Sequence, residues 1–266
     1  MDIVKRALVE DGAFRDLSSA IIPNHRVTGR FLAKQDLVVC GMDLARSAFG
    51  HVGVAFAPKF RDGKPAKRGS ILATVAGPAR RVLAGERTAL NFLQQLSGVA
   101  TITRRFADLA RPARVFDTRK TTPGLRALEK HPVRCGGGYN HRMGLDDGVM
   151  IKDNHIAAIG DLDALREKVE ALAAKRKPIV IEAQSLDQAL LFATFPVQVL
   201  MLDNFSVAEL RRAVPKVRAL SPTLEIEASG GVNLKTVAAI ARTGVDRVSV
   251  GALTHSAPAV DISLDL

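Results

Sequence analysis

The stretch that decides the fold is residues 179–229, which read IVIEAQSLDQALLFATFPVQVLMLDNFSVAELRRAVPKVRALSPTLEIEAS. Its three short apolar runs, Ile179–Ala183, Val197–Leu202 and Leu224–Ala228, are typical of buried β-strands. The two segments between them, Leu186–Phe195 and Val207–Leu220, carry apolar residues at helical spacing. Strands that alternate with helices predict right-handed βαβ units and therefore a parallel sheet.

The alternation continues on both sides of this stretch. Further strands are expected at Val115–Thr118, Val149–Ile151 and Arg247–Val250, and further helices at Leu162–Lys175 and Leu234–Thr243. Strands and helices in this order form either a closed (β/α) barrel or an open doubly wound sheet. Periodicity alone leaves both architectures open.

The polar residues favour the barrel. Charged residues and glycines end or directly follow every predicted strand: Arg119, Lys120, Lys152, Glu182, Asp203, Ser229-Gly230-Gly231 and Gly251. In a (β/α) barrel the carboxyl ends of all strands meet on one face, which carries the chemistry. An open sheet would place only the strands at its switch point around a ligand. We therefore expect a barrel-like closure with a functional rim.

The pattern before residue 112 is different. β-like runs at Val27–Val39 and Ile71–Val75 flank the glycine-containing turn Arg61–Pro65, and a long helix follows at Gly85–Leu109. This mixture predicts an N-terminal α/β domain over residues 1–111, ahead of a barrel domain over residues 112–254.

The net charge of +11 and the isoelectric point near 10.1 call for an anionic partner. Nucleic acid is one candidate, but the chain has no Trp, a single Tyr and cations spread among acids rather than gathered in a tail. A basic cleft that concentrates small polyanionic substrates explains the charge equally well. The net charge alone does not decide between nucleic acid and small anionic substrates.

The expected compartment is the cytoplasm. No run approaches the roughly 20 apolar residues of a membrane span, and the start of the chain lacks the apolar region of a secretory signal. The two cysteines, Cys40 and Cys135, make a disulfide framework improbable and show no His–Cys spacing that suggests zinc. G-x-S-x-G and P-loop motifs are also absent from the sequence.

Two segments carry candidate anion-binding groups. The turn Asp117–Arg126 places Arg119 and Lys120 at a strand end, although a solvated surface turn has about even odds on composition alone. The run Gly136-Gly137-Gly138 precedes His141 and Arg142, and a planar guanidinium binds a carboxylate through two parallel hydrogen bonds. A histidine taken alone is more often structural than functional.

Glu182 and Asp203 end adjacent predicted strands. Two carboxylates in a cationic cleft suit a hydrated Mg²⁺ or ribose hydroxyls, and the alternative is that each pairs with a nearby lysine. Ser229-Gly230-Gly231 and Gly251-Ala252 offer backbone donors to a phosphate, in the place where barrels often bind one.

Long motifs in one order give the chain a family resemblance. They are Gly85–Gly98, Asp117–Arg126, Gly136–Arg142, Ile151–His155, Leu202–Phe205, Ala228–Gly231 and Val250–Ser256. Over nearly its whole length the chain resembles the quinolinate phosphoribosyltransferases. The resemblance implies an N-terminal α/β sandwich-like domain, an incomplete (β/α) barrel with parallel strands, and a C-terminal tail, residues 255–266, that returns to the first domain.

The resemblance also implies the activity. It is phosphoribosyl transfer to quinolinate with decarboxylation, which yields nicotinate mononucleotide, pyrophosphate and CO2 in de novo NAD biosynthesis. The implied partners are quinolinate and phosphoribosyl pyrophosphate, with no nucleic acid and no membrane. The implied assembly is a homodimer or a dimer-based hexamer whose N-terminal domain closes the partner's site.

Residue roles follow from the same resemblance. The positions expected to hold the quinolinate carboxylates are Arg119, His141, Arg142 and Lys152, with Arg87 reaching in from the partner subunit. Lys120 is expected between the two substrates as the catalytic cation. Glu182 and Asp203 are expected at the ribose and Mg²⁺, directly or through water. The positions expected at the 5′-phosphate are Ser229, Gly230, Gly251 and His255.

Three positions depart from the family pattern. Val180 stands where a glutamate is common, Gln184 replaces a usual acid, and Arg15 replaces a glycine. One alternative is a paralogue associated with molybdenum transport operons, against which Asn140 argues because proline is expected there. The other alternative is a basic nucleic-acid-binding protein.

Overall fold

The computed structural model describes residues 2–23, 25–174 and 178–266, which form two compact units. The first unit contains Met1–Arg104, Ala127–Gly137 and Ser256–Leu266, and the second contains Arg105–Arg126 and Gly138–His255. Residues 127–137 thus belong to the first unit, although they lie beyond the expected cut at residue 111. They do so because helix α4 (Arg126–Cys135) packs on α3 (Ala79–Leu109): a Cβ on Gly136, directly after α4, would lie 2.5 Å from the carbonyl oxygen of Ala100.

The first unit is built on an antiparallel sheet of four strands in the order β12-β1-β5-β3. These strands are β1 (Arg26–Ala33), β3 (Ala55–Pro58), β5 (Ile71–Pro78) and β12 (Ile262–Asp265). The expected run Val27–Val39 was wrong as a single strand. β1 ends at Ala33, and β2 (Leu37–Val38) leaves the sheet to pair with β4 (Pro65–Ala66).

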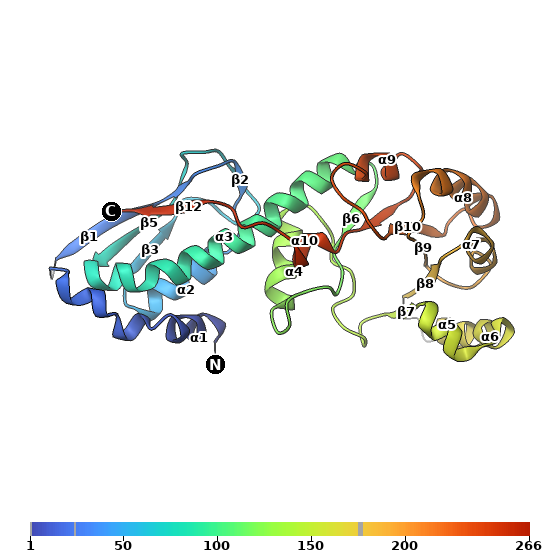
Figure 1. Ribbon diagram of the computed structural model, residues 1–266, viewed down its shortest axis with the longest axis horizontal. Coiled ribbons are helices and arrows are strands. Elements are labelled where there is room, and N and C mark those ends of the chain that lie inside the picture. The colour runs from blue at the N-terminus through green and yellow to red at the C-terminus, as the bar shows by residue number, and fades with distance from the viewer. Residues whose placement is uncertain (1, 24, 175–177) are drawn as a thin grey trace. The chain divides into compact units, whose positions relative to one another are not determined.

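Helices cover one face of this sheet, as Figure 1 shows for α2 and the first part of α3. The first unit contains α1 (Ile3–Glu10), η1 (Ala13–Arg15), η2 (Leu17–Ile21), α2 (Met42–His51), α4 (Arg126–Cys135) and most of α3 (Ala79–Leu109). Phe31 of β1 packs edge-on against Phe49 of α2 and Phe56 of β3, with ring centroids 5.8 and 5.7 Å apart. Buried aromatic rings therefore join the sheet to its helical layer.

The second unit contains a six-stranded sheet in the order β6-β11-β10-β9-β8-β7, and all of its pairings are parallel. The strands are β6 (Arg114–Phe116), β7 (Val149–Ile151), β8 (Ile179–Ala183), β9 (Val199–Asp203), β10 (Glu225–Ser229) and β11 (Arg247–Ser249). Every strand lies within two residues of its expected range. Among the described residues β6 and β7 do not pair, so the ladder stays open. The expected fold class is confirmed.

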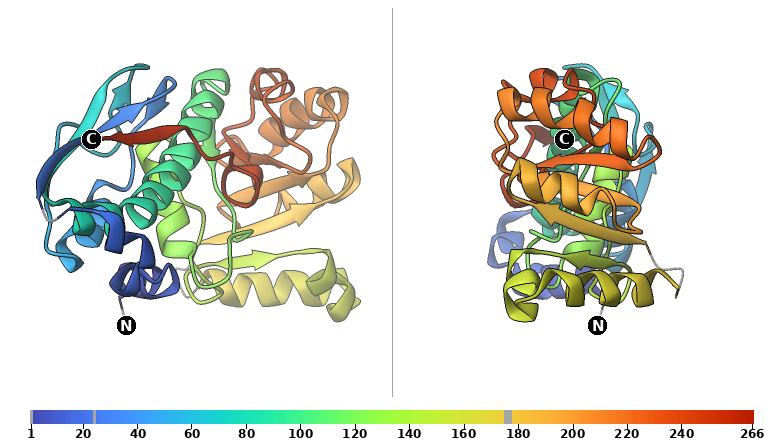
Figure 2. Two further views of the ribbon diagram at one scale, coloured as in Figure 1. Left: turned by 60° about the vertical axis from the view of Figure 1, so that its left-hand side comes forward. Right: turned by 90° about the vertical axis from the view of Figure 1, so that its right-hand side faces the viewer.

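Helices α6, α7 and α8 lie along one side of this sheet in Figure 1, and Figure 2 shows the strands stacked side by side. The helices of the unit are α5 (Asp153–Ile159), α6 (Leu162–Ala173), α7 (Leu186–Phe192), α8 (Val207–Leu220), α9 (Val237–Ala241) and α10 (Ala252–His255). α8 begins as expected, with a capping box between Ser206 and Glu209. Lys175, the expected end of α6, lies outside the described residues.

Helix α9 is shorter than expected, because its predicted first turn is a side-chain-stabilised loop. The Asn233 carboxamide oxygen accepts hydrogen bonds from the backbone N–H groups of Lys235 and Thr236 at 2.9 and 3.2 Å. An Asx turn of this kind competes with helical geometry. None of the helices among the described residues is both long and apolar enough to cross a bilayer.

Candidate active site

The second unit has a pocket of about 470 Å³ at the carboxyl ends of its strands. Its lining residues are Thr118, Arg119, Lys120, His141, Arg142, Met150, Lys152, Met201, Asp203, Asn204, Ser229, Gly230, Gly231 and Ser249. Eight of the twelve residues to which the family resemblance gives a role are among them: Arg119, Lys120, His141, Arg142, Lys152, Asp203, Ser229 and Gly230. Thr118 and Ser249, 131 residues apart in the sequence, both line it because parallel strands bring their carboxyl ends to one edge of the sheet.

His141 is fixed by hydrogen bonds on both its backbone and its ring. Its backbone N–H donates to Oδ1 of the buried Asp117 at 2.8 Å, and its Nδ1 accepts from the backbone N–H of Arg142 at 2.9 Å. A neutral ring that accepts at Nδ1 carries its proton on Nε2. Nε2 lies 3.7 Å from Oε1 of Glu227, a fully buried carboxylate.

Two guanidinium groups, those of Arg119 and Arg142, line the same pocket. Nη1 of Arg142 donates to the carbonyl oxygen of Gly148 at 2.9 Å. Burial lowers the pKa of Arg142, and the nearby charge of Arg119 lowers it further. The two cations repel each other in the free pocket, and an anion placed between them would relieve that repulsion.

Lys152, at the end of β7, forms an ion pair with Glu182 at the end of β8. Glu182 is buried, whereas the Lys152 side chain is partly exposed. The lysine pairing left open by the sequence is thus realised for Glu182. Asp203 lines the pocket itself and accepts a hydrogen bond from Nδ2 of Asn204 at 2.7 Å.

The loop after β10 approaches the end of β9 closely. Gly230 has φ of +90°, and a Cβ there would lie 2.1 Å from Oδ1 of Asn204. Asn204 itself has φ of +59° and donates its backbone N–H to the carbonyl of Ser229 at 2.9 Å. Only glycine fits at position 230, because both the backbone conformation and the neighbouring side chain exclude a larger residue.

Gly251 and His255 lie beside Lys120 rather than among the lining residues. A Cβ on Gly251 would lie 3.1 Å from both Nε2 of His255 and Cδ of Lys120. The Thr254 hydroxyl donates to the carbonyl oxygen of Lys120 at 2.7 Å. The segment after β11 therefore supports the cationic turn after β6.

Arg87, the remaining residue singled out from the sequence, lies on α3 in the first unit with an exposed side chain. Every residue that lines the pocket belongs to the second unit.

Sequence reasoning missed Glu227 and Ser249. The Ser249 hydroxyl donates to Oε1 of Glu227, the oxygen that faces His141. Both residues lie in strands, whereas the candidates predicted from the sequence end or follow a predicted strand. The available signal was a glutamate within an apolar strand, because a buried carboxylate needs a polar partner.

Two family models together cover almost the whole chain. The model described as "Quinolinate phosphoribosyl transferase, N-terminal domain" matches residues 2–97, and the one described as "Quinolinate phosphoribosyl transferase, C-terminal domain" matches residues 99–265.

Relatives with established names are similar over their full length. A protein of Mycobacterium leprae named nicotinate-nucleotide pyrophosphorylase [carboxylating] is 42% identical over 275 residues, which cover 100% of this chain and 96% of the relative. A Bacillus subtilis protein named probable nicotinate-nucleotide pyrophosphorylase [carboxylating] is 37% identical, with 99% and 92% covered.

Solved structures agree in fold. The crystal structure titled NadC from Streptococcus pyogenes has a TM-score of 0.90 and 38% identity, and the match covers 99% of this chain and 94% of that one. A nicotinate-nucleotide pyrophosphorylase from Ehrlichia chaffeensis has a TM-score of 0.91 and 37% identity, with 99% and 97% covered.

Proposed function

Because the chain belongs to the quinolinate phosphoribosyltransferase family, we propose that the pocket of its second unit is where quinolinate and phosphoribosyl pyrophosphate react. The enzyme is a pentosyltransferase of NAD biosynthesis. It transfers the phosphoribosyl group to quinolinate with loss of CO2 and yields nicotinate mononucleotide and pyrophosphate. The observation that carries the assignment of the pocket is that four cations, Arg119, Lys120, Arg142 and Lys152, line it together.

Charge explains why such a pocket is needed. Quinolinate has two carboxylates, and phosphoribosyl pyrophosphate carries several further negative charges, so the reaction brings like charges together. A cation about 4 Å from an anion gains roughly 4 kcal/mol at an effective dielectric constant near 20, before desolvation. Four cations in one pocket of about 470 Å³ offset much of the repulsion between the substrates.

The quinolinate carboxylates are assigned to Arg119, His141, Arg142 and Lys152. His141 lines the pocket, while its Nε2 lies 3.7 Å from Oε1 of Glu227. Glu227 and Ser249 act through His141 as positioning residues, since Oε1 of Glu227 faces Nε2 of the ring and accepts a hydrogen bond from Ser249. Arg142 and Lys152 are already held by Gly148 and Glu182, so little side-chain freedom is lost on binding.

The sugar phosphate is assigned to the neighbouring strand ends. The 5′-phosphate would contact Ser229, Gly230, Gly251 and His255, where backbone N–H groups of the loops after β10 and β11 can donate to an anion. The ribose hydroxyls would contact Asp203 and Glu182.

Magnesium fits the residues on this side of the pocket. Asp203 offers a carboxylate in the pocket lining, and Glu182 ends the next strand, which suits an ion that uses one or two carboxylates plus substrate phosphates. When bound, Mg²⁺ would neutralise charge on the departing pyrophosphate.

The reaction needs no covalent enzyme intermediate. The ring nitrogen of quinolinate forms a bond to the anomeric carbon while the bond to pyrophosphate breaks. The resulting pyridinium accepts the electron pair left when the adjacent carboxylate leaves as CO2, and a proton then replaces it. Lys120 lines the pocket and lies beside Gly251, and we assign to it the stabilisation of the charge that develops during both steps.

The direct test is an assay of the purified chain with quinolinate, phosphoribosyl pyrophosphate and Mg²⁺. We expect nicotinate mononucleotide and CO2 in equal amounts, detected by chromatography and by release of labelled CO2. Folded protein that forms no product would reject the proposal. Omitting Mg²⁺ from the same assay tests the metal, since unchanged turnover in the presence of a chelator would exclude it.

The proposed assembly is a dimer in which Arg87 serves the partner's site. Mixed dimers of Arg87→Ala and Arg142→Ala chains test this arrangement in the same assay. Each variant alone is expected to be impaired, and mixing would regenerate a native site in one of every pair of sites. Absence of any recovery in demonstrably mixed dimers would contradict a shared site.

A further inference from the structure

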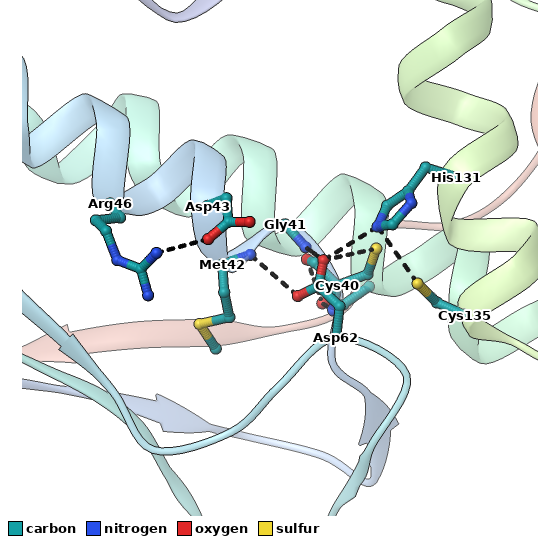
Figure 3. Close-up of polar contacts among 9 residues, drawn as sticks. Cys40, Gly41, Met42, Asp43, Arg46, Asp62, His131 and Cys135 are labelled. Atoms are coloured by element: carbon teal, nitrogen blue, oxygen red, sulfur yellow. Dashed lines mark hydrogen bonds and ion pairs between the residues drawn. The ribbon is translucent and has the colours of Figure 1, made fainter.

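The first unit contains a second cluster of reactive side chains. Cys40, Asp62, His131 and Cys135 each offer one potential metal ligand, and these four atoms all lie within 4.8 Å of one another. Figure 3 shows the four side chains pointing toward one another. None of them lines the pocket of the second unit, and the reaction proposed above uses none of them.

Three separate elements deliver these residues. Cys40 follows β2 and precedes α2, and Asp62 lies in the turn before β4. His131 and Cys135 are four residues apart on α4, so they project from the same face of the helix. The cluster therefore joins α4 to the loops beside the N-terminal sheet, all within the first unit.

Three of the six distances between the ligand atoms match the edges of a zinc tetrahedron, and the other three are at most 4.8 Å. Bond lengths of about 2.3 Å to sulfur and about 2.0–2.1 Å to nitrogen and oxygen give tetrahedral edges of about 3.6 Å for S···N and S···O and about 3.3 Å for N···O. The observed distances are 3.5 Å from Cys135 Sγ to His131 Nε2, 3.6 Å from Cys40 Sγ to Asp62 Oδ2, and 3.3 Å from His131 Nε2 to Asp62 Oδ2.

Neighbouring groups hold the ligands in this arrangement. The Asp62 carboxylate accepts hydrogen bonds from the backbone N–H groups of Gly41 at 3.0 Å and Met42 at 3.2 Å. The backbone N–H of the buried Cys40 donates to the Ser97 hydroxyl at 2.9 Å. Outer contacts of this kind orient metal ligands and are part of a built site.

A further property suits a metal ion. A cavity of about 410 Å³, lined in part by Asp62 and His131, reaches the cluster and gives an ion a path from solvent.

We propose that Cys40, Asp62, His131 and Cys135 form a four-coordinate Zn²⁺ site. Binding releases one proton from each thiol to solvent, while His131 binds as the neutral ring and Asp62 as the carboxylate. Four protein ligands leave no open position for substrate, so the site is structural and clamps α4 against the N-terminal loops.

The test begins with metal content. The reduced full-length chain, loaded with Zn²⁺ and passed through gel filtration, is expected to retain one zinc per chain by elemental analysis. Cys135→Ser and His131→Gln are expected to lose it. His25→Gln is the matched control, since His25 is another exposed histidine of the same unit and is expected to keep full zinc.

Spectroscopy and stability give independent readouts. Cobalt substituted for zinc should show a thiolate-to-metal charge-transfer band in the native chain that weakens in Cys135→Ser. Zinc should raise the melting temperature of the native chain and of His25→Gln, and have no effect on His131→Gln. Circular dichroism checks that each variant is folded.

Three results would overturn the proposal. One is reduced native protein that binds no zinc. Another is zinc retained equally by native protein, Cys135→Ser and His131→Gln. The third is a thiol pair that oxidises to a disulfide, seen as the loss of two hydrogens by mass spectrometry, in a chain that takes up no zinc even after full reduction.

Discussion

Arg142 is held in the pocket before any substrate arrives. Its side chain donates to the carbonyl of Gly148, and its backbone N–H supports the ring of His141. The same residue therefore carries charge and orients its neighbour. Burial and the charge of Arg119 both lower its pKa, so a bound carboxylate would stabilise the charged form of a group that is otherwise poorly solvated.

Replacing Arg142 is expected to weaken the binding of one substrate much more than that of the other. Arg142→Ala removes a charge-assisted hydrogen bond worth about 1.5–3 kcal/mol, and we expect quinolinate affinity to fall about 10- to 100-fold. Affinity for phosphoribosyl pyrophosphate should change by less than about threefold. Calorimetric titration of each ligand measures both effects, with Arg211→Ala on the exposed face of α8 as the control. Equal losses for the two ligands would show that Arg142 does not act as a carboxylate clamp.

Much of the residue-level site could be predicted from the sequence, because parallel strands gather whatever follows them. Arg119, Lys152 and Asp203 were found in this way. Glu227 was not, because it lies within β10, and Ser249 was not, because the strand was expected to continue to Val250. The cluster of Cys40 with Cys135 depends on the spacing of His131 and Cys135 along α4, a helix that the sequence did not predict.

At the scale of elements, the contact between the residues that follow β9 and β10 tolerates few substitutions. Asn204 and Gly230 both have positive φ and lie in contact at the ends of adjacent strands. Gly231 also has positive φ, at +61°, but a Cβ there would meet nothing within 4 Å. Both glycines thus have a left-handed backbone conformation, but only Gly230 lacks space for a Cβ atom.

This difference makes a matched pair of substitutions. Alanine at either position costs about 1–2 kcal/mol for the left-handed backbone. Gly230→Ala also drives a methyl group into the Asn204 side chain, so we expect it to lower affinity for phosphoribosyl pyrophosphate at least tenfold more than Gly231→Ala does. Ligand titrations and melting temperatures of the two variants measure the contrast. The same affinity in both would mean that the Asn204–Gly230 contact does not shape the phosphate site.

The strands of the second unit were easier to predict than the elements around them. Each is a short run of apolar residues, and burial on both faces leaves few alternatives. The first unit was harder, because β2 and β4 are two residues long and pair although α2 and β3 lie between them in the chain. Helix α4 was not predicted, because Gly124 and Pro132 are residues typical of turns. The chain is nevertheless helical from Arg126 to Cys135.

At the scale of the whole molecule, the first unit is assembled from three stretches of sequence. Its sheet is completed by β12, whose residues Ile262–Asp265 pair with Arg30–Ala33 of β1. The stretch leading to β12 passes close to α3, where a Cβ on Gly98 would lie 2.1 Å from the carbonyl oxygen of Pro258. Cutting the chain at residue 111 would therefore remove part of the first unit's core.

The contribution of β12 can be measured by substitution. Ile262 is 2% exposed in the core of the first unit, whereas Leu266 is 60% exposed. We expect Ile262→Ala to destabilise that unit by about 2–5 kcal/mol and Leu266→Ala by less than about 0.5 kcal/mol. Urea unfolding followed by circular dichroism measures both. Similar stabilities for the two variants would show that β12 adds little to the core.

Sharing one sheet between distant stretches also affects how the protein is made. Residues 262–265 leave the ribosome only after every residue of the second unit, so β1 has an open edge throughout the intervening synthesis. The second unit can fold before synthesis ends, but the sheet of the first unit is complete only after β12 has been made. During that interval the exposed edge of β1 is a place where chaperones, or other unfinished copies, can bind.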